Sequence, residues 1–158
     1  MSEIVLTRID DRLIHGQVMT AWVKKTQANQ ILIIDDEVAK DDFMSEVMKM
    51  SAPSGIDIFV RGVDESITFL KKEIEDDTRL IILTKGPEVI EKLIESGVNI
   101  EKLIVGGMGA KTNRKVLYKN ISASEEEREI FKKILSQGVP ISIHIIPDQK
   151  AMDLSKYL

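Results

Sequence analysis

The stretch ILII, residues 31–34, is apolar at all four positions and runs directly into Asp35 and Asp36. A strand with one face in water alternates polar and apolar residues, whereas a parallel strand covered by helices on both faces is continuously apolar. Further short runs rich in apolar residues occur at Ile4–Leu6, Ile56–Val60, Leu80–Leu83, Leu103–Val105 and Ile141–Ile146. Together these runs predict the strands of a mostly parallel sheet.

The segments between these runs repeat apolar residues at helical spacing. Residues 89–94 place four apolar side chains on one helical face, after Pro87, which suits a first turn, and before Gly97, which suits a helix end. Ser124 and Glu127 have the spacing of a capping box. We therefore predict a three-layer α/β sandwich, in which helices flank a mostly parallel central sheet of six to seven strands. Residues 116–121 are assigned to a short additional strand.

The composition is that of an ordinary folded protein, because 43% of the 158 residues are hydrophobic and 30% are charged. The length predicts a single domain over residues 1–158. A net charge of −4 gives no general attraction to nucleic acid. The absence of cysteine excludes disulfides and thiolate metal sites and suits a reducing cytoplasm. Without a signal-peptide pattern or a membrane-length apolar run, the chain is expected to be cytoplasmic and not itself membrane-spanning.

Two segments that follow predicted strands combine charged residues with glycine. They are RIDDRLIHGQVM, residues 8–19, and GGMGAKTNR, residues 106–114. Ligands of open parallel sheets bind beyond the carboxyl ends of the strands. We therefore expect the functional site where these two segments meet.

In the first segment, His15 stands where a helix should begin, because Val18, Ala21 and Trp22 form an apolar stripe from that point. The free N–H groups and the positive dipole end of a helix N-terminus attract anions. Such a position suits a histidine that handles phosphate.

The charged residues around this histidine fit the same chemistry. The guanidinium groups of Arg8 and Arg12 suit phosphate, because each guanidinium can donate two parallel hydrogen bonds to phosphate oxygens. Asp10 or Asp11 could orient the imidazole and leave its other nitrogen nucleophilic. The same residues also fit a capping histidine beside simple arginine–aspartate ion pairs, and the residues alone favour neither interpretation.

The glycines of the second segment do not form a nucleotide-binding loop, because their spacing matches neither the Walker A nor the dinucleotide-binding pattern. Gly106 and Gly107 are expected to let the backbone pass close to the His15 loop or to a phosphate on it. Lys111 and Arg114 would extend a positive rim. Asp35 and Asp36 fall at the same predicted sheet edge, where helix capping is favoured over a catalytic or metal-binding role.

The segment RIDDRLIHGQV followed by Trp22 resembles the IIB component of the mannose/fructose/sorbose family of bacterial sugar phosphotransferase systems. The resemblance covers the whole chain. It extends to IIDDEVAKDDF at residues 33–43, MKMSAPSGI at 48–56, VGGMG at 105–109 and GVPISIHIIP at 138–147.

This resemblance implies that His15 accepts a phosphoryl group from a phosphohistidine of a IIA component and donates it to a sugar imported through the membrane components IIC and IID. Arg8 and Arg12 would steady the group, and the backbone N–H groups of Gly16 and Gln17 would bind its oxygens. Asp10 or Asp11 would orient the imidazole. No cofactor or metal is implied, and the protein would associate peripherally with the cytoplasmic membrane through IIC and IID. A homo-oligomer is compatible with the sequence, which does not identify the sugar.

Two other functions fit the residues less well. A histidine phosphatase or phosphomutase would place arginine directly before the histidine, where this chain has Ile14, and would need His144 as a second catalytic histidine. His144 is interpreted instead as packed or hydrogen-bonded in the sheet. A receiver-like module would end its third strand in aspartate, where this chain has Arg61.

Overall fold

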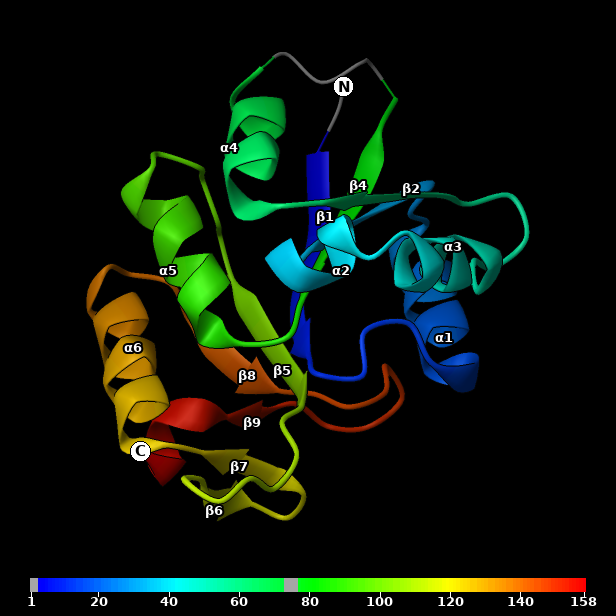
Figure 1. Cartoon of the computed structure of the whole chain (residues 1–158). Helices are drawn as coiled ribbons and strands as arrows, with labels where there is room; N and C mark the ends of the chain where they lie inside the picture. The colour runs from blue at the N-terminus through cyan, green and yellow to red at the C-terminus, as the bar shows by residue number, and fades with distance from the viewer. Residues whose placement is uncertain (1–2, 73–76) are drawn as a thin grey trace.

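In the computed structural model, which describes residues 3–72 and 77–158, a seven-stranded sheet lies between two layers of helices (Figure 1). The strand order is β3-β2-β4-β1-β5-β8-β9. The strands are β1 (Glu3–Asp10), β2 (Gln30–Ile34), β3 (Asp57–Arg61), β4 (Arg79–Thr84), β5 (Leu103–Gly107), β8 (Ile141–Ile143) and β9 (Met152–Asp153). Within this sheet only β9 pairs antiparallel with its neighbour, so the prediction of a three-layer α/β fold with a mostly parallel sheet is confirmed.

The helices divide between the two faces of the sheet. The first face carries α1 (Gly16–Thr26), α2 (Asp36–Lys40) and α3 (Asp42–Met50). The second carries α4 (Val63–Lys71), α5 (Pro87–Glu95) and α6 (Glu125–Ser136). A 3₁₀ turn, Leu154–Tyr157, follows β9.

Strand β2 shows why the continuous apolar run determines the fold. All four residues 31–34 have no exposed surface. Ile31 and Ile33 pack with the first layer of helices, and Leu32 and Ile34 pack with the second. Since both faces of the strand are covered, no polar position interrupts the run.

The topology places a ligand-binding position between β1 and β4, which are neighbours in the sheet. After β1 the chain continues into α1 on the first face, whereas after β4 it continues into α5 on the second. The two connections therefore diverge at the carboxyl ends of these strands, which is where open α/β sheets bind their ligands. We call this side of the sheet the carboxyl edge.

Two predicted strands differ from the observed ones. The predicted strand at Ile141–Ile146 ends at Ile143, because the chain turns away and directs the carbonyl groups of His144 and Ile145 to the Arg8 side chain. The additional strand at 116–121 is an antiparallel hairpin of two strands, β6 (Lys115–Tyr118) and β7 (Ile121–Ala123). It packs against the carboxyl edge through a bridge between Met108 and Ile121.

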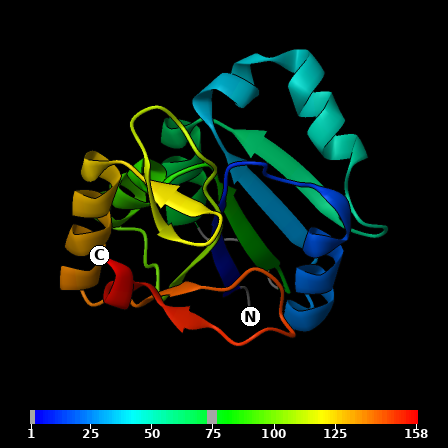
Figure 2. The ribbon, with the colours of Figure 1, turned by 90° about the horizontal axis from the view of Figure 1, so that it is seen from below.

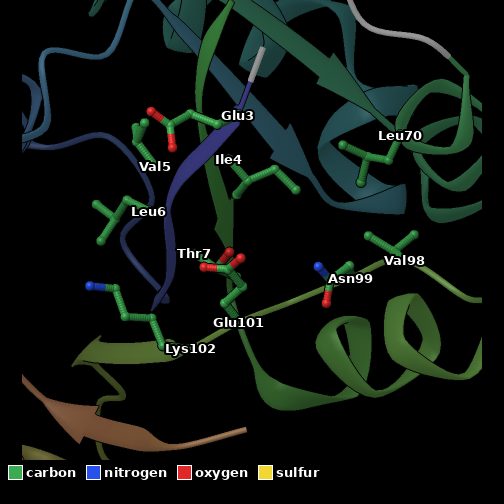
Figure 3. Close-up of a pocket in the computed structure, with 10 residues that line it drawn as sticks. All are labelled: Glu3, Ile4, Val5, Leu6, Thr7, Leu70, Val98, Asn99, Glu101 and Lys102. Atoms are coloured by element: carbon green, nitrogen blue, oxygen red, sulfur yellow. The ribbon is translucent and has the colours of Figure 1, made fainter. Parts of the chain in front are cut away.

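A pocket of about 310 Å³ lies at the opposite end of β1 (Figure 3). It exists because β1 pairs with β4 from Glu3 onward but with β5 only from Arg8 onward. Residues 3–7, Leu70 and part of the α5–β5 connection line it. None of the residues predicted for the functional site lines this pocket.

Candidate active site

The backbone around His15 is held in an uncommon conformation. His15 is the N-cap residue of α1, and its side chain makes no capping hydrogen bond. Leu13 and Gly16 have φ angles of 57° and 49°, in the left-handed region. Glycine adopts that region freely, but Leu13 is a bulky residue for which it costs on the order of 1–3 kcal/mol. Because Leu13 is buried, packing compensates this strain and fixes the loop that presents His15.

The imidazole of His15 is a quarter exposed and is held through Nδ1. This nitrogen lies 3.3 Å from the carbonyl oxygen of Leu13 and 3.8 Å from Oδ2 of Asp10. Nε2 is buried and has no hydrogen-bond partner among the described residues. Of the two aspartates that the sequence leaves open, Asp10 is therefore the one that faces the imidazole.

Asp10 joins the two arginines of the segment. Its carboxylate is 1% exposed. Oδ1 accepts hydrogen bonds from the backbone N–H of Arg12 at 3.1 Å and from Arg12 Nε at 3.2 Å, and Oδ2 lies 3.4 Å from the guanidinium of Arg8. Arg12 is half exposed, so it can pair with Asp10 and still present N–H groups to a phosphoryl group beside His15.

Arg8 occupies a different position from the one expected for a phosphate ligand. Its side chain has no exposed surface. It donates hydrogen bonds to the carbonyl oxygens of His144 at 2.7 Å and Ile145 at 3.0 Å, and it lies 5.3 Å from the centre of the Trp22 ring. Burial lowers the pKa of Arg8, although Asp10 opposes the shift. Arg8 therefore positions Asp10 and the 144–145 segment, and its N–H groups do not point to the open side of the site.

The two glycines that end β5 allow the backbone to approach these charged groups, as expected. A Cβ atom on Gly106 would lie 1.9 Å from the guanidinium of Arg8, and one on Gly107 would lie 2.7 Å from Oδ1 of Asp10. Neither position has room for a side chain. The second segment thus forms one wall of the site through its main chain.

Asp11 has a separate role, which is to join the His15 loop to the second segment. Its backbone N–H bonds to the carbonyl oxygen of Gly107, and its Oδ2 accepts the N–H of Gly109 at 2.7 Å. The same oxygen lies 3.5 Å from Arg114. Arg114 in turn makes two 2.8 Å hydrogen bonds to the carboxylate of Glu127 in α6. Arg114 is thus buried in a connection between the loop and α6 and does not extend a positive rim.

This connection is a source of pH-dependent stability. Burial by itself would raise the pKa of Glu127, but hydrogen bonds from Arg114 and from the Ser124 N–H lower it below its ordinary value. A lowered pKa contributes stability above the ordinary pKa, and this contribution is lost as the pH falls through the folded-state value.

We expect Glu127→Gln to lower the free energy of unfolding by about 3 kcal/mol at pH 7, because it removes the charged partner of two 2.8 Å hydrogen bonds of the buried Arg114 and leaves only the longer ionic contact with Asp11. The difference from wild type should begin to shrink below about pH 4.5, where the carboxylate of the unfolded chain takes up a proton, and should be lost as the pH falls through the lowered pKa of the folded state. Urea unfolding of wild type and Glu127→Gln at pH 7 and below about pH 4.5 measures this difference in the free energy of unfolding. Glu125→Gln, an exposed position in the same helical turn, should change stability by less than about 0.5 kcal/mol. A Glu127→Gln penalty that persists at low pH would contradict the prediction.

The remaining predicted residues lie outside this cluster. Asp35 caps α2 by accepting the N–H of Val38 at 3.0 Å, and Asp36 accepts the N–H of Val63 at the start of α4. The preference for capping is therefore confirmed. Lys111 is exposed on the loop before the hairpin.

The surroundings of the site are open on the side of α1. A groove of about 540 Å³ lies between this helix and residues 146–148, and Gln17, Lys24 and Lys25 are among its lining residues. Within the described residues, no cluster of three or more histidine, cysteine or acidic side chains is placed to hold a metal ion. The described helices also include none that is long and apolar enough to cross a membrane.

Comparisons with known proteins agree on one family. The family described as "PTS system sorbose subfamily IIB component" matches residues 4–158. The sorbose-specific EIIB component of Lacticaseibacillus casei is 30% identical, over 96% of this chain and 92% of that protein. The mannose-specific EIIAB component of Escherichia coli strain K12 is 35% identical over 96% of this chain, which spans about half (48%) of that protein's length. The crystal structure of the sorbose permease IIB domain from Klebsiella pneumoniae superposes with a TM-score of 0.94 at 28% identity, covering 99% of this chain and 96% of that one.

Proposed function

The chain belongs to the sorbose subfamily of the IIB components of PTS sugar phosphotransferase systems, and on this basis we propose that His15 carries the phosphoryl group that the protein transfers. The donor is a phosphorylated IIA component, and the acceptor is a sugar brought by the membrane components IIC and IID. The protein then works in the cytoplasm, at the membrane surface where those components lie.

The observation that carries this proposal is the setting of His15. A partly exposed imidazole at a helix N-terminus lies beside a buried carboxylate and a half-exposed arginine. In the transfer, the phosphorus–nitrogen bond of the donor breaks as a new one forms at His15. Asp10 orients the ring, Arg12 stabilises charge on the transferring group, and the N–H groups of Gly16 and Gln17 bind its oxygens.

The proposal is tested by supplying the purified protein with phosphoenolpyruvate, the general phosphotransferase proteins and a IIA component of this family. One phosphoryl group per chain should be incorporated, labile in acid and stable in alkali, as a phosphohistidine is. A IIA component that labels a known IIB protein of the family but never labels this one would refute the proposal.

Arg12→Ala is expected to slow phosphoryl transfer about 100-fold, because a charge that stabilises the transferring group is lost. The free energy of unfolding should change by less than about 1 kcal/mol, since the side chain is half exposed. Rapid-quench kinetics and urea unfolding measure the two effects. The matched control is Lys85→Ala, which removes a similarly half-exposed cation that is paired with Asp35 at the same carboxyl edge and should leave the rate unchanged. Comparable losses of rate and stability in Arg12→Ala would instead indicate a structural arginine.

A further inference from the structure

The charge of this chain is distributed unevenly along its length. Acidic residues outnumber basic ones by 26 to 22 overall. Residues 102–124 nevertheless contain five lysines and arginines and no aspartate or glutamate. Such a segment in an acidic protein marks a local positive surface, which is a feature of partner recognition rather than of folding.

The structure places most of this segment at the carboxyl edge, next to the loop that carries His15. Residues 108–123, which comprise the loop after β5 and the β6–β7 hairpin, are called the basic arm here. Its Gly109 N–H is bonded to Asp11 in the His15 loop. Viewed from below, the basic arm lies beside the β1 end of the connection from β1 to α1, and α1 lies at the other end of that connection (Figure 2). The basic arm therefore flanks the loop that carries His15.

The lysines of the basic arm are available to such a partner. Lys111, Lys115 and Lys119 are exposed, and none of them forms an ion pair with a described residue. The acidic groups packed against the arm, Asp11 and Glu127, are both engaged by Arg114.

Two further features complete this surface. Val116, which lies between Lys115 and Lys119 in the sequence, is 66% exposed and offers an apolar contact. The exposed Glu125 and Glu126 follow the arm in the first turn of α6, where they offset the positive end of the helix dipole. The exposed part of the arm thus carries three lysines without an ionic partner in the part of the chain that the structure describes, and one exposed apolar side chain.

We infer that the basic arm is the docking surface for an acidic face of the phosphorylated donor protein, an inference that rests on the proposed function. The donor arrives with about two additional negative charges on its phosphoryl group, whereas a sugar acceptor is neutral. The arm therefore attracts the loaded donor more strongly than the unloaded one. After transfer the phosphoryl charge belongs to His15, and the attraction that held the donor is reduced, which favours its release.

The test is reversal of the three lysines, in the variant Lys111→Glu/Lys115→Glu/Lys119→Glu. We expect kcat/KM for phosphorylation by the IIA component that labels wild type to fall about tenfold or more at low ionic strength. The loss should appear in KM, and the transfer rate at saturating donor should remain close to that of wild type, because no residue of the transfer step is altered. The dependence of kcat/KM on salt should also weaken.

A matched control reverses three exposed lysines elsewhere, as Lys71→Glu/Lys72→Glu/Lys92→Glu in and after α4 and in α5. The control changes the net charge by the same amount as the basic-arm variant. An equal loss of kcat/KM in the control would therefore show a general charge effect and overturn the inference. Unchanged kcat/KM in the basic-arm variant would overturn it as well.

Transfer of the phosphoryl group from the protein to sugar tests whether the basic arm serves the membrane components IIC and IID instead. If the basic-arm variant accepts the phosphoryl group normally but fails to pass it to sugar in vesicles that contain IIC and IID, the surface serves the membrane components and the inference is wrong. If wild type itself takes no label, the proposed function fails and this inference with it. If wild type and the basic-arm variant are labelled with the same kcat/KM, the inference is refuted and the proposed function stands.

Discussion

His15→Ala should incorporate no phosphoryl group, even after prolonged incubation with an excess of the phosphorylated donor. The loss is complete because, in the proposed mechanism, the side chain supplies the atom to which phosphorus bonds, whereas Asp10 and Arg12 only orient that atom or stabilise charge beside it. The fold should be retained, since His15 is a quarter exposed and makes no capping hydrogen bond. Label incorporation and thermal unfolding of the same preparation measure both statements.

His144 provides the matched control, because the chain has only two histidines. Its ring packs edge-on against Trp22, and its Nε2 lies 2.7 Å from the carbonyl oxygen of Gln149. His144→Ala should lose stability through this packing and still incorporate the full label. Label on His15→Ala, or loss of label only in His144→Ala, would contradict the assignment.

Gly106→Ala should lower the free energy of unfolding by about 3 kcal/mol or more, which corresponds to roughly 6–12 °C in the melting temperature of a domain of this size. The added Cβ would lie 1.9 Å from the guanidinium of Arg8. A flexible side chain could move aside, but this one is buried and donates hydrogen bonds to two carbonyl oxygens. The methyl group therefore displaces either a buried charge or strand β5.

A double-mutant cycle assigns this loss to the contact with Arg8. Arg8→Ala is destabilising by itself, but Gly106→Ala should add less than about 1 kcal/mol in that background because the clash is gone. Gly109→Ala is the matched glycine control, since its Cβ would lie 3.5 Å from the nearest carboxylate oxygen, an ordinary contact. Equal effects of Gly106→Ala in both backgrounds would show that the strain arises elsewhere.

The sequence predicts the sheet because the signal for it is local. A strand buried on both faces must be apolar at every position, and β2 shows this within four residues. The approximate position of the site follows from topology, since the carboxyl ends of neighbouring parallel strands meet at one edge. His15 and Asp10 are close in the chain, and so are close in the structure.

The parts that the sequence could not predict depend on distant contacts. Arg8 could bind phosphate oxygens or carbonyl oxygens, and it binds carbonyl groups 136 and 137 positions away. Glu127 is recognisable as half of a capping box, but nothing local shows that its carboxylate also binds Arg114. The choice between Asp10 and Asp11 also depended on a distant contact. Asp11 accepts a hydrogen bond from the N–H of Gly109, which leaves Asp10 to face the imidazole.

The hydrogen bonds of Arg8 also set the order in which the nascent chain can become functional. The arginine is synthesised long before its two carbonyl partners, which belong to residues 144 and 145. At a synthesis rate of about 5–20 residues per second, they follow it by roughly 7–27 seconds. Until then the guanidinium lacks the contacts that bury it and hold it against Asp10. A chain that stops short of these residues therefore exposes His15 without its oriented carboxylate, and the site becomes competent only after residues 144 and 145 have been added.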